Sequence, residues 1–186
     1  MRDYRLLHQL FVVVVIAILA AGCNPSNNGA LQAPEGHLQA DKDAITQLYN
    51  VWKTAVENGD RGGYVNVLDE QVTMIAPGAA DIVGRDAYAK FLIPVFQHAE
   101  YRIETLGEIQ IDLLGDYALV RYDYIVHVSM AEGVAKITDD QAALDQLVNK
   151  AKYLDVLKRQ DSGEWKVYRH MWNEGPQDPP EVQVEG

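Results

Sequence analysis

Apolar residues recur at helical spacing in the segment that follows residue 40. Asp41 or Asp43 can cap the start of a helix here, and Gly59 suits its end. Asp60 then has the character of an N-cap for a short second helix through Leu68. The pattern therefore predicts two consecutive helices. The apolar face of the first consists of Ile45, Leu48, Tyr49, Trp52, Ala55 and Val56.

A strand and a third helix are expected next. Val72–Ala76 alternates as a strand and stops at a Pro-Gly pair. Gly84 precedes a helix, and Pro94 lies within it. Because proline lacks an amide proton and crowds the preceding turn, we expect it to kink or end this helix near Ile93. The apolar side of the third helix holds Ala87, Tyr88, Phe91, Leu92 and Val95.

After residue 99 the spacing of the apolar residues changes from the helical period to every second residue. Strands are predicted over Tyr101–Leu113, with a bulge at Gly107, and over Tyr117–Met130. In the second of these strands every other residue is apolar or aromatic, which is typical of a face that turns to a core or pocket. That face consists of Ala118, Val120, Tyr122, Tyr124, Val126, Val128 and Met130.

The C-terminal third returns to strands after an interruption. Residues 131–150 are expected to hold a short helix capped by Asp139 or Asp140. Lys152–Gln160 and Trp165–Asn173 then form a hairpin. Because helices come first and long strands follow, the order predicts an α+β fold, in which N-terminal helices cover a cone-shaped, curved antiparallel sheet.

The first 23 residues have a different character from the rest. A short basic start, Met1–Arg5, precedes the mainly apolar run Leu6–Leu19, and small residues lead directly to Cys23, the only cysteine. This layout resembles the lipobox of bacterial lipoproteins. The resemblance implies that a signal peptide, residues 1–22, is removed and that Cys23 is lipidated and tethers the chain to a membrane. A plain secretory signal or an uncleaved anchor is the alternative.

The remaining chain divides into three parts. Residues 23–40 form a lipidated, flexible tether, 41–174 the folded domain and 175–186 a disordered acidic tail. Asn24 follows the cysteine, and by resemblance to proteobacterial sorting this favours the outer membrane, with the domain facing the periplasm. The protein is therefore expected in the cell envelope.

The charge of the chain limits its partners. The net charge is −11, and removal of residues 1–22, which sum to +1, leaves −12. Such a surface repels phosphate backbones, so we expect no nucleic-acid binding. The histidines lack metal-ligand spacing, no Gly-rich phosphate loop occurs, and we expect neither a metal nor a cofactor.

Three stretches of the domain are informative together: AITQLYNVWKTAVENGD at 44–60, IVGRDAY at 82–88 and YLDVLKRQDSGEWKVYRHMWN at 153–173. By their order and spacing the domain resembles the nuclear-transport-factor-2-like superfamily, within it the SnoaL-like and ketosteroid-isomerase-like branch. The resemblance implies a cone-shaped pocket and frequent dimerisation through the open sheet face. It implies no single activity, because the fold carries isomerases, cyclases, dehydratases, ligand carriers and assembly modules.

Steroid isomerisation needs a carboxylate base and an oxyanion hole that contains a tyrosine. The resemblance aligns Ala76 with the base and Trp52 with the oxyanion tyrosine. Both principal groups are therefore replaced, and whether the protein is an enzyme stays open. The remaining acid-base candidates are Asp155, Arg169 and His170. Arg169 could equally pair with Asp155 on the neighbouring strand, and the alternative for His170 is a partly exposed strand histidine without a function.

The face of the last strand decides which residues reach the pocket. The resemblance of its Gly-x-Trp step favours the Trp165 face as the inner one. Each of the proposed lining residues could also be simple core. The predicted ligand-binding set is Tyr49, Trp52, Met74, Tyr88, Tyr122, Tyr124, Met171 and Asn173, with Tyr64 and Phe91 beside it.

Three hypotheses for function follow. The preferred one is that the domain binds a small apolar or amphipathic ligand in its cone without chemistry. The second is an enzyme of the isomerase, dehydratase or cyclase kind with unorthodox acid-base groups. The third is an envelope protein-interaction module, including a homodimer; a cavity filled by Trp52, Tyr122 and Met171 would favour it.

Overall fold

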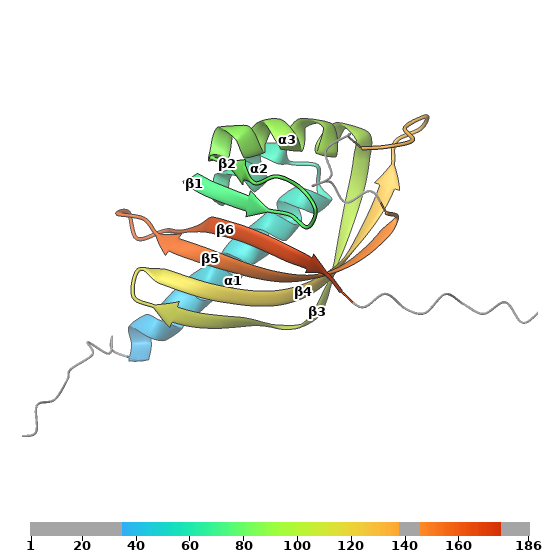
Figure 1. The fold of residues 1–186 in the computed structure, drawn as a ribbon. Coiled ribbons are helices and arrows are strands. Elements are labelled where there is room, and N and C mark those ends of the chain that lie inside the picture. Colours follow the sequence, from blue (N-terminus) through green and yellow to red (C-terminus); the bar gives the residue numbers. More distant parts are fainter. Residues whose placement is uncertain (1–34, 138–145, 176–186) are drawn as a thin grey trace, which may run out of the picture. The chain divides into compact units, whose positions relative to one another are not determined.

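The protein is described by a computed structural model that covers residues 35–137 and 146–175. Helices lie on one side of a single curved sheet (Figure 1). The predicted α+β class and the cone-shaped sheet covered by helices are confirmed. The elements are α1 (Glu35–Glu57), α2 (Arg61–Asn66), β1 (Leu68–Ile75), β2 (Ile82–Val83), α3 (Arg85–His98), β3 (Ala99–Leu114), β4 (Tyr117–Met130), β5 (Val148–Arg159) and β6 (Trp165–Glu174).

The sheet has six strands in the order β2-β1-β6-β5-β4-β3. All neighbours are antiparallel except β1 and β6, which run parallel, so the sheet is not antiparallel throughout as predicted. The chain reaches β1 directly from the helices and inserts it beside the last strand. This places the end of β6 in the middle of the sheet, next to the helices.

The pairing of β3 with β4 is interrupted once. The predicted bulge at Gly107 is present: this residue has φ 76°, and the β3–β4 register shifts between Leu106 and Gln110. A positive φ strains any residue with a Cβ, which explains the glycine. The long strand β4 buries the predicted face through Val128, and Met130 at its end is half-buried.

The first helix begins at Glu35, six residues before the predicted start of the folded body. Asp41 does not cap the helix. Its carboxylate binds the Arg159 guanidinium at 2.6 and 2.5 Å and accepts from the Trp165 indole at 3.3 Å. Because these contacts hold Asp41 against the sheet, the helix extends ahead of it.

The second helix lies against α1 at a glycine. Asp60 is its N-cap, as predicted, and accepts a hydrogen bond from the Gly63 amide. A Cβ on Gly63 would stand 3.0 Å from the Ala55 Cβ and 2.5 Å from the Asp60 Oδ2. The absence of a side chain therefore allows α2 to approach α1, and this approach sets the position of Tyr64. The helix is shorter than predicted and β1 longer, since β1 begins at Leu68.

The third helix does not end near Ile93. It passes through Pro94 and ends at His98. One lost amide bond is tolerated because Leu92 is buried and Val95 and Phe96 pack on the core, so tertiary contacts hold the last turn in place.

The last strand contains a bulge that the sequence did not reveal. Val156 of β5 pairs with Arg169, and the next residue, Leu157, pairs with Val167. Tyr168 therefore has no partner residue in the β5–β6 strand pairing. Since side chains alternate along a strand, one extra residue exchanges the two faces beyond it. Trp165 and Val167 point into the core as predicted.

Beyond the bulge the prediction of the inner face is wrong. His170 and Trp172 are buried, whereas Arg169, Met171 and Asn173 lie on the outer side of the sheet. These three residues were expected to line the pocket.

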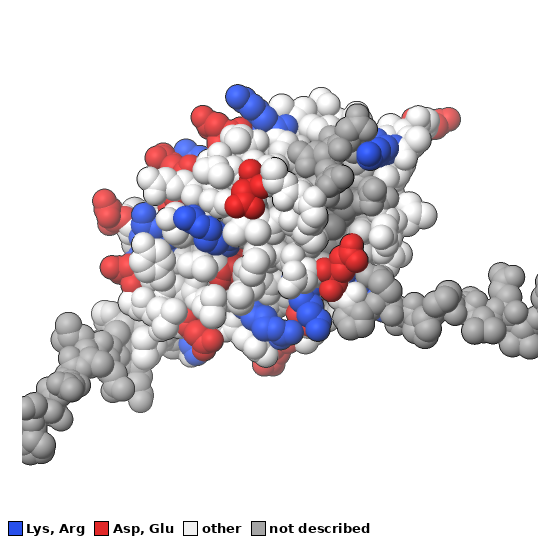
Figure 2. Space-filling view, in the orientation of Figure 1, with Lys and Arg blue, Asp and Glu red and all other residues white. Residues whose placement is uncertain are grey.

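Several expectations lie outside the described residues. They concern the signal peptide and Cys23, most of the tether, the helix capped by Asp139 or Asp140 and the acidic tail. In the part of the chain that the structure describes, no helix is long and apolar enough to cross a membrane. Acidic and basic side chains are interspersed on the face seen in Figure 2.

Candidate functional site

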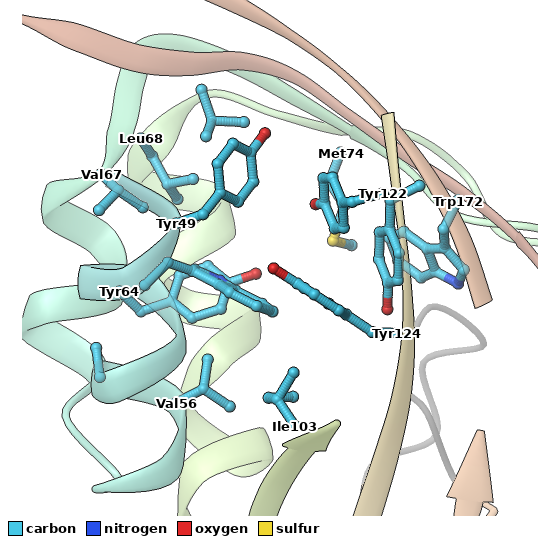
Figure 3. Packing of buried hydrophobic residues seen from close by; sticks show 14 of the residues in the cluster. Tyr49, Val56, Tyr64, Val67, Leu68, Met74, Ile103, Tyr122, Tyr124 and Trp172 are labelled. Atoms are coloured by element: carbon cyan, nitrogen blue, oxygen red, sulfur yellow. The ribbon is translucent and has the colours of Figure 1, made fainter. Parts of the chain in front are cut away.

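A small pocket lies between the helices and the concave side of the sheet. Its volume is about 90 Å³. Aromatic side chains from both layers surround this region, and Figure 3 shows Tyr64 among them. The lining contains no Asp, Glu, Lys or Arg. It consists of Trp52, Val56, Tyr64, Met74, Tyr88, Phe91, Leu92, Val95, Phe96, Tyr101, Ile103, Val126, Tyr153, His170 and Trp172.

The main polar group of the pocket is a histidine paired with a buried aspartate. Asp155 of β5 and His170 of β6 are directly opposite in the strand register. The His170 Nδ1 lies 2.9 Å from the Asp155 Oδ1. Asp155 is 1% exposed and His170 is 7% exposed, so both groups are removed from bulk water. The sheet itself therefore fixes the pair.

Two tyrosines complete the surroundings of the aspartate. The hydroxyls of Tyr49 and Tyr122 donate to Asp155 Oδ2 at 2.7 and 2.9 Å. Burial, followed by the nearby Asp155 charge, raises the pKa of both phenols well above 10.0. They therefore stay protonated near neutral pH and act as donors.

The free face of His170 determines what the pair can do. An ionised Asp155 accepts the Nδ1 proton, which leaves Nε2 with a lone pair. Among residues 35–137 and 146–175, none makes a hydrogen bond to Nε2. The ring packs against both Tyr153 and Trp172, at centroid distances of 5.6 and 5.5 Å. An oriented imidazole whose Nε2 carries a lone pair can accept a proton from a bound molecule and return it.

A pair of phenols lies on the helical side of the pocket. The hydroxyls of Tyr64 in α2 and Tyr88 in α3 are 2.8 Å apart. Burial raises the pKa of both side chains above 10.0, and that of Tyr88 well above it. Both hydroxyls therefore stay protonated at physiological pH.

Some of the predicted ligand-binding residues line the pocket, and others lie elsewhere in the structure. Six of the residues named from the sequence line the pocket: Trp52, Tyr64, Met74, Tyr88, Phe91 and His170. Tyr49 and Tyr122 lie behind it and bind Asp155. Tyr124 stacks on Trp52 with ring planes 8° apart, so it supports the pocket wall and does not form it.

The remaining predictions for the site are wrong. Met171 and Asn173 face outward because of the bulge at Tyr168. Arg169 does not pair with Asp155. Its guanidinium lies 3.6 Å from the Tyr168 ring centroid and donates to the Tyr168 and Gln71 carbonyls.

Sequence reasoning missed Tyr153 and Trp172. Tyr153 alternates with Ala151, Asp155 and Leu157, so the period of β5 could have placed it on the inner face. Trp172 could not be placed, since the bulge carries no glycine or proline that marks it.

The classical isomerase positions remain apolar in the structure. Ala76 is buried at the end of β1, and Trp52 stands in the pocket wall. Among the described residues, no three His, Cys, Asp or Glu side chains gather in a way that could hold a metal ion. The acid-base capacity of the pocket therefore rests on His170 and the phenols.

Solved structures with this fold include proteins of several descriptions. A hexachlorocyclohexane dehydrochlorinase (LinA, type 2) superimposes with a TM-score of 0.60 at 16% identity, covering 80% of this chain and 100% of that chain. A ketosteroid isomerase-like protein from Erwinia carotovora atroseptica gives 0.55 at 18%, covering 73% and 96%. A nuclear transport factor 2-like protein from Salmonella enterica gives 0.61 at 11%, covering 78% and 98%.

These similarities show the fold, because all three identities are low. No curated protein sequence matches the chain. The family of SnoaL-like domains matches residues 39–170, which extend from the first turns of α1 to the pocket histidine. The chain therefore belongs to the SnoaL-like domain family.

Proposed function

We propose that the domain binds a compact, mainly apolar ring compound in this pocket and that His170, oriented by Asp155, exchanges a proton with it. The observation that carries this proposal is the 2.9 Å hydrogen bond between His170 Nδ1 and Asp155 Oδ1 at the wall of an otherwise uncharged pocket. The function is thus of the isomerase or dehydratase type, with a histidine in the role of the base.

The size of the pocket limits the ligand. Its volume of about 90 Å³ is well below the roughly 300–1,000 Å³ of pockets that bind drug-sized molecules. The lining is aromatic and aliphatic, so burial of apolar ligand surface supplies most of the affinity. A molecule of one or two small rings fits these conditions better than a long lipid.

The chemistry proposed for His170 is a proton transfer. Nε2 takes a proton from a C–H or O–H group of the ligand, and the bonding electrons move into the ligand. The imidazolium is stabilised by Asp155 and later returns its proton. A positioned general base contributes roughly 10²–10⁴-fold to a rate.

Binding without chemistry is the second candidate. It is favoured by the absence of a carboxylate from the pocket lining, since many acid-base enzymes use two ionisable groups. A pure interaction module fits less well: Met171, expected to help fill the cavity, lies outside, and a cavity remains.

The proposed proton transfer can be tested with a probe compound whose ring opens when it loses a proton, so the natural substrate is not needed. Removal of the C3 proton of benzisoxazole breaks its N–O bond and yields a cyanophenolate, which is followed by its absorbance. We expect the domain to accelerate this reaction and His170→Gln to lose the acceleration. His127→Gln is the matched control, because His127 also pairs with an acid, Glu104 at 3.2 Å, but on the outer face of the sheet.

The result separates the two candidates. Equal rates for the wild type and His170→Gln would exclude His170 as the base. Tryptophan fluorescence, with Trp52 and Trp172 in the pocket wall, reports binding independently. A fluorescence change without any acceleration of the ring-opening reaction would support binding without chemistry.

We also propose that lipid on Cys23 tethers the domain to the periplasmic side of the outer membrane. The support is the layout of residues 1–23, in which a basic start and an apolar run lead to Cys23. Metabolic labelling with an alkyne fatty acid should mark the wild type and not Cys23→Ala. Equal labelling of both chains would contradict the tether.

A further inference from the structure

The bulge of β6 interrupts the strand pairing on both sides. In the described chain, Tyr168 has no partner residue in β5 or in β1, the two strands that flank β6. The register of β1 against β6 passes from Leu68 to Thr73, so residues 69–72 lie opposite Tyr168 alone. Backbone pairing is therefore interrupted at this point of β6, and other contacts fix the strand here.

Arg169 joins the parts of this irregularity. Its guanidinium lies 3.6 Å from the centroid of the Tyr168 ring and donates to the Tyr168 carbonyl at 2.8 Å. The same nitrogen donates to the carbonyl of Gln71 in β1 at 3.3 Å. A guanidinium suits this task because its planar group stacks on a ring and offers several donors. One side chain thus binds the bulged residue and links it to the neighbouring strand.

A buried carboxylate holds the β1 side of this contact. Asp69 is 5% exposed and does not line the pocket. Its Oδ1 accepts from the Gln71 amide at 2.7 Å, and its Oδ2 accepts from the Gln160 side chain at 2.9 Å. Asp69 therefore fixes the backbone at Gln71, whose carbonyl is the acceptor for Arg169.

The residue that follows Arg169 is the pocket histidine. The 2.9 Å hydrogen bond between His170 and Asp155 depends on the position of the β6 backbone. A misplacement of about 1 Å at a reacting group can lower a rate by about 10²-fold. Contacts on the outer face of the sheet thus fix a group on the inner face, although Arg169 does not line the pocket.

We propose that Arg169 is a positioning residue, which fixes the bulge at Tyr168 and thereby holds His170 toward Asp155 and the pocket. The inference rests on the proposed function, because it concerns the orientation of the same base. Its geometric part concerns the free protein and can be measured without a ligand.

The hydrogen bond of His170 can be observed by NMR. In protein labelled at its histidine nitrogens, a ring proton bound to a buried carboxylate gives a low-field signal that exchanges slowly with water. Its absence in His170→Gln assigns the signal. We expect the signal in the wild type. Arg169→Met keeps an unbranched side chain but loses the donors, and it should broaden or lose the signal while the amide spectrum stays that of a folded protein.

Two further variants assign the effect to the guanidinium. Arg169→Lys keeps the charge but not the planar group, so its signal should be intermediate. Arg121→Met is the matched control. Arg121 also lies on the outer face and pairs with an acid, Asp123 at 3.2 Å, but it belongs to β4, which is not a neighbour of β6. This control should keep the signal of the wild type.

The benzisoxazole reaction measures the consequence for the base. We expect Arg169→Met to lower kcat by about 10- to 100-fold. Its KM should change by less than about threefold, because most of the apolar lining belongs to other elements. Arg121→Met should leave both constants unchanged.

The two measurements distinguish this proposal from the proposed function. An Arg169→Met protein that keeps either the signal or the rate of the wild type overturns the role of Arg169, while His170 remains the proposed base. A wild type that shows the signal without acceleration contradicts the proton transfer, and the signal alone then decides the role of Arg169. A wild type without the signal contradicts both. If Arg169→Met does not fold, Arg169→Lys is compared with Arg121→Met in the same way.

Discussion

Arg159 and Asp41 lie 118 positions apart in the chain and bind each other through two nearly parallel hydrogen bonds at 2.6 and 2.5 Å. The pair fixes α1 to the end of β5, and the Arg159 guanidinium also lies 4.3 Å from the centroid of the Trp165 ring. Bidentate geometry of this kind is the most specific form of ion pairing between side chains.

Stability at low pH should depend on this ion pair. The hydrogen bond from Arg159 lowers the pKa of Asp41 below 3.8 in the folded protein. A lowered folded-state pKa gives stability that is present above the unfolded value and lost as the pH falls through the folded value. Asp41→Asn should cost about 0.5–1 kcal/mol at pH 7. The cost should shrink below pH 3.8, as measured by urea unfolding across pH. A cost independent of pH would exclude the ion pair as its source.

Removal of one tyrosine hydroxyl should destabilise the buried aspartate. In Tyr49→Phe the Asp155 Oδ2 loses its 2.7 Å donor and keeps only Tyr122. Loss of one of the donors to a buried carboxylate should cost about 1–3 kcal/mol, measured by urea unfolding. Tyr117→Phe, on an exposed side chain, should change stability by less than about 0.5 kcal/mol. Equal losses in both variants would show that the Asp155 contact contributes nothing specific.

The two glycines of α2 should respond oppositely to alanine. Gly63→Ala places its Cβ against Asp60 and Ala55 and should cost about 1–3 kcal/mol, because the cap and the helix contact must both shift. At Gly62 the nearest atom to a Cβ would be 3.3 Å away. Here the helical preference of alanine dominates, and stability should stay equal or rise by up to about 1 kcal/mol. Thermal unfolding of the two variants distinguishes them; a loss at Gly62 as large as at Gly63 would contradict the packing argument.

The buried phenols should resist titration by alkali. Burial raises the pKa of Tyr49, Tyr64, Tyr88, Tyr101, Tyr122, Tyr124 and Tyr153. A raised folded-state pKa gives stability that is present below the unfolded value, 10.0, and lost as the pH rises beyond it. The phenolate absorbance of these residues should therefore appear together with the loss of tertiary circular dichroism. Ionisation of all tyrosines in a single step near 10, with the fold intact, would contradict their burial.

Local patterns predicted most of the fold because they follow directly from periodicity. The alternation from Tyr117 to Val128 identified the buried face of β4, and Gly107 identified a bulge because the backbone there needs a positive φ. The start of α1 was predicted late because contacts with Arg159 and Trp165, both distant in the chain, hold its first turns.

The candidate site was predictable only in part. His170 and Asp155 were both named as acid-base candidates, but their pairing follows from a strand register that periodicity alone does not supply. The assignment of Arg169, Met171 and Asn173 failed for one reason: the bulged residue, Tyr168, is an ordinary strand former and leaves no local signal.

The bulge in β6 means that the chemistry of the pocket depends on how a strand pairs as well as on its side chains. If Tyr168 were paired in the ladder, the end of β6 would rotate by one position, and a cation and a thioether would replace an imidazole and an indole on the concave side. One backbone irregularity can thus convert one kind of cavity into another without any substitution. Related chains that share these side chains but have a regular last strand would present unlike interiors to their ligands.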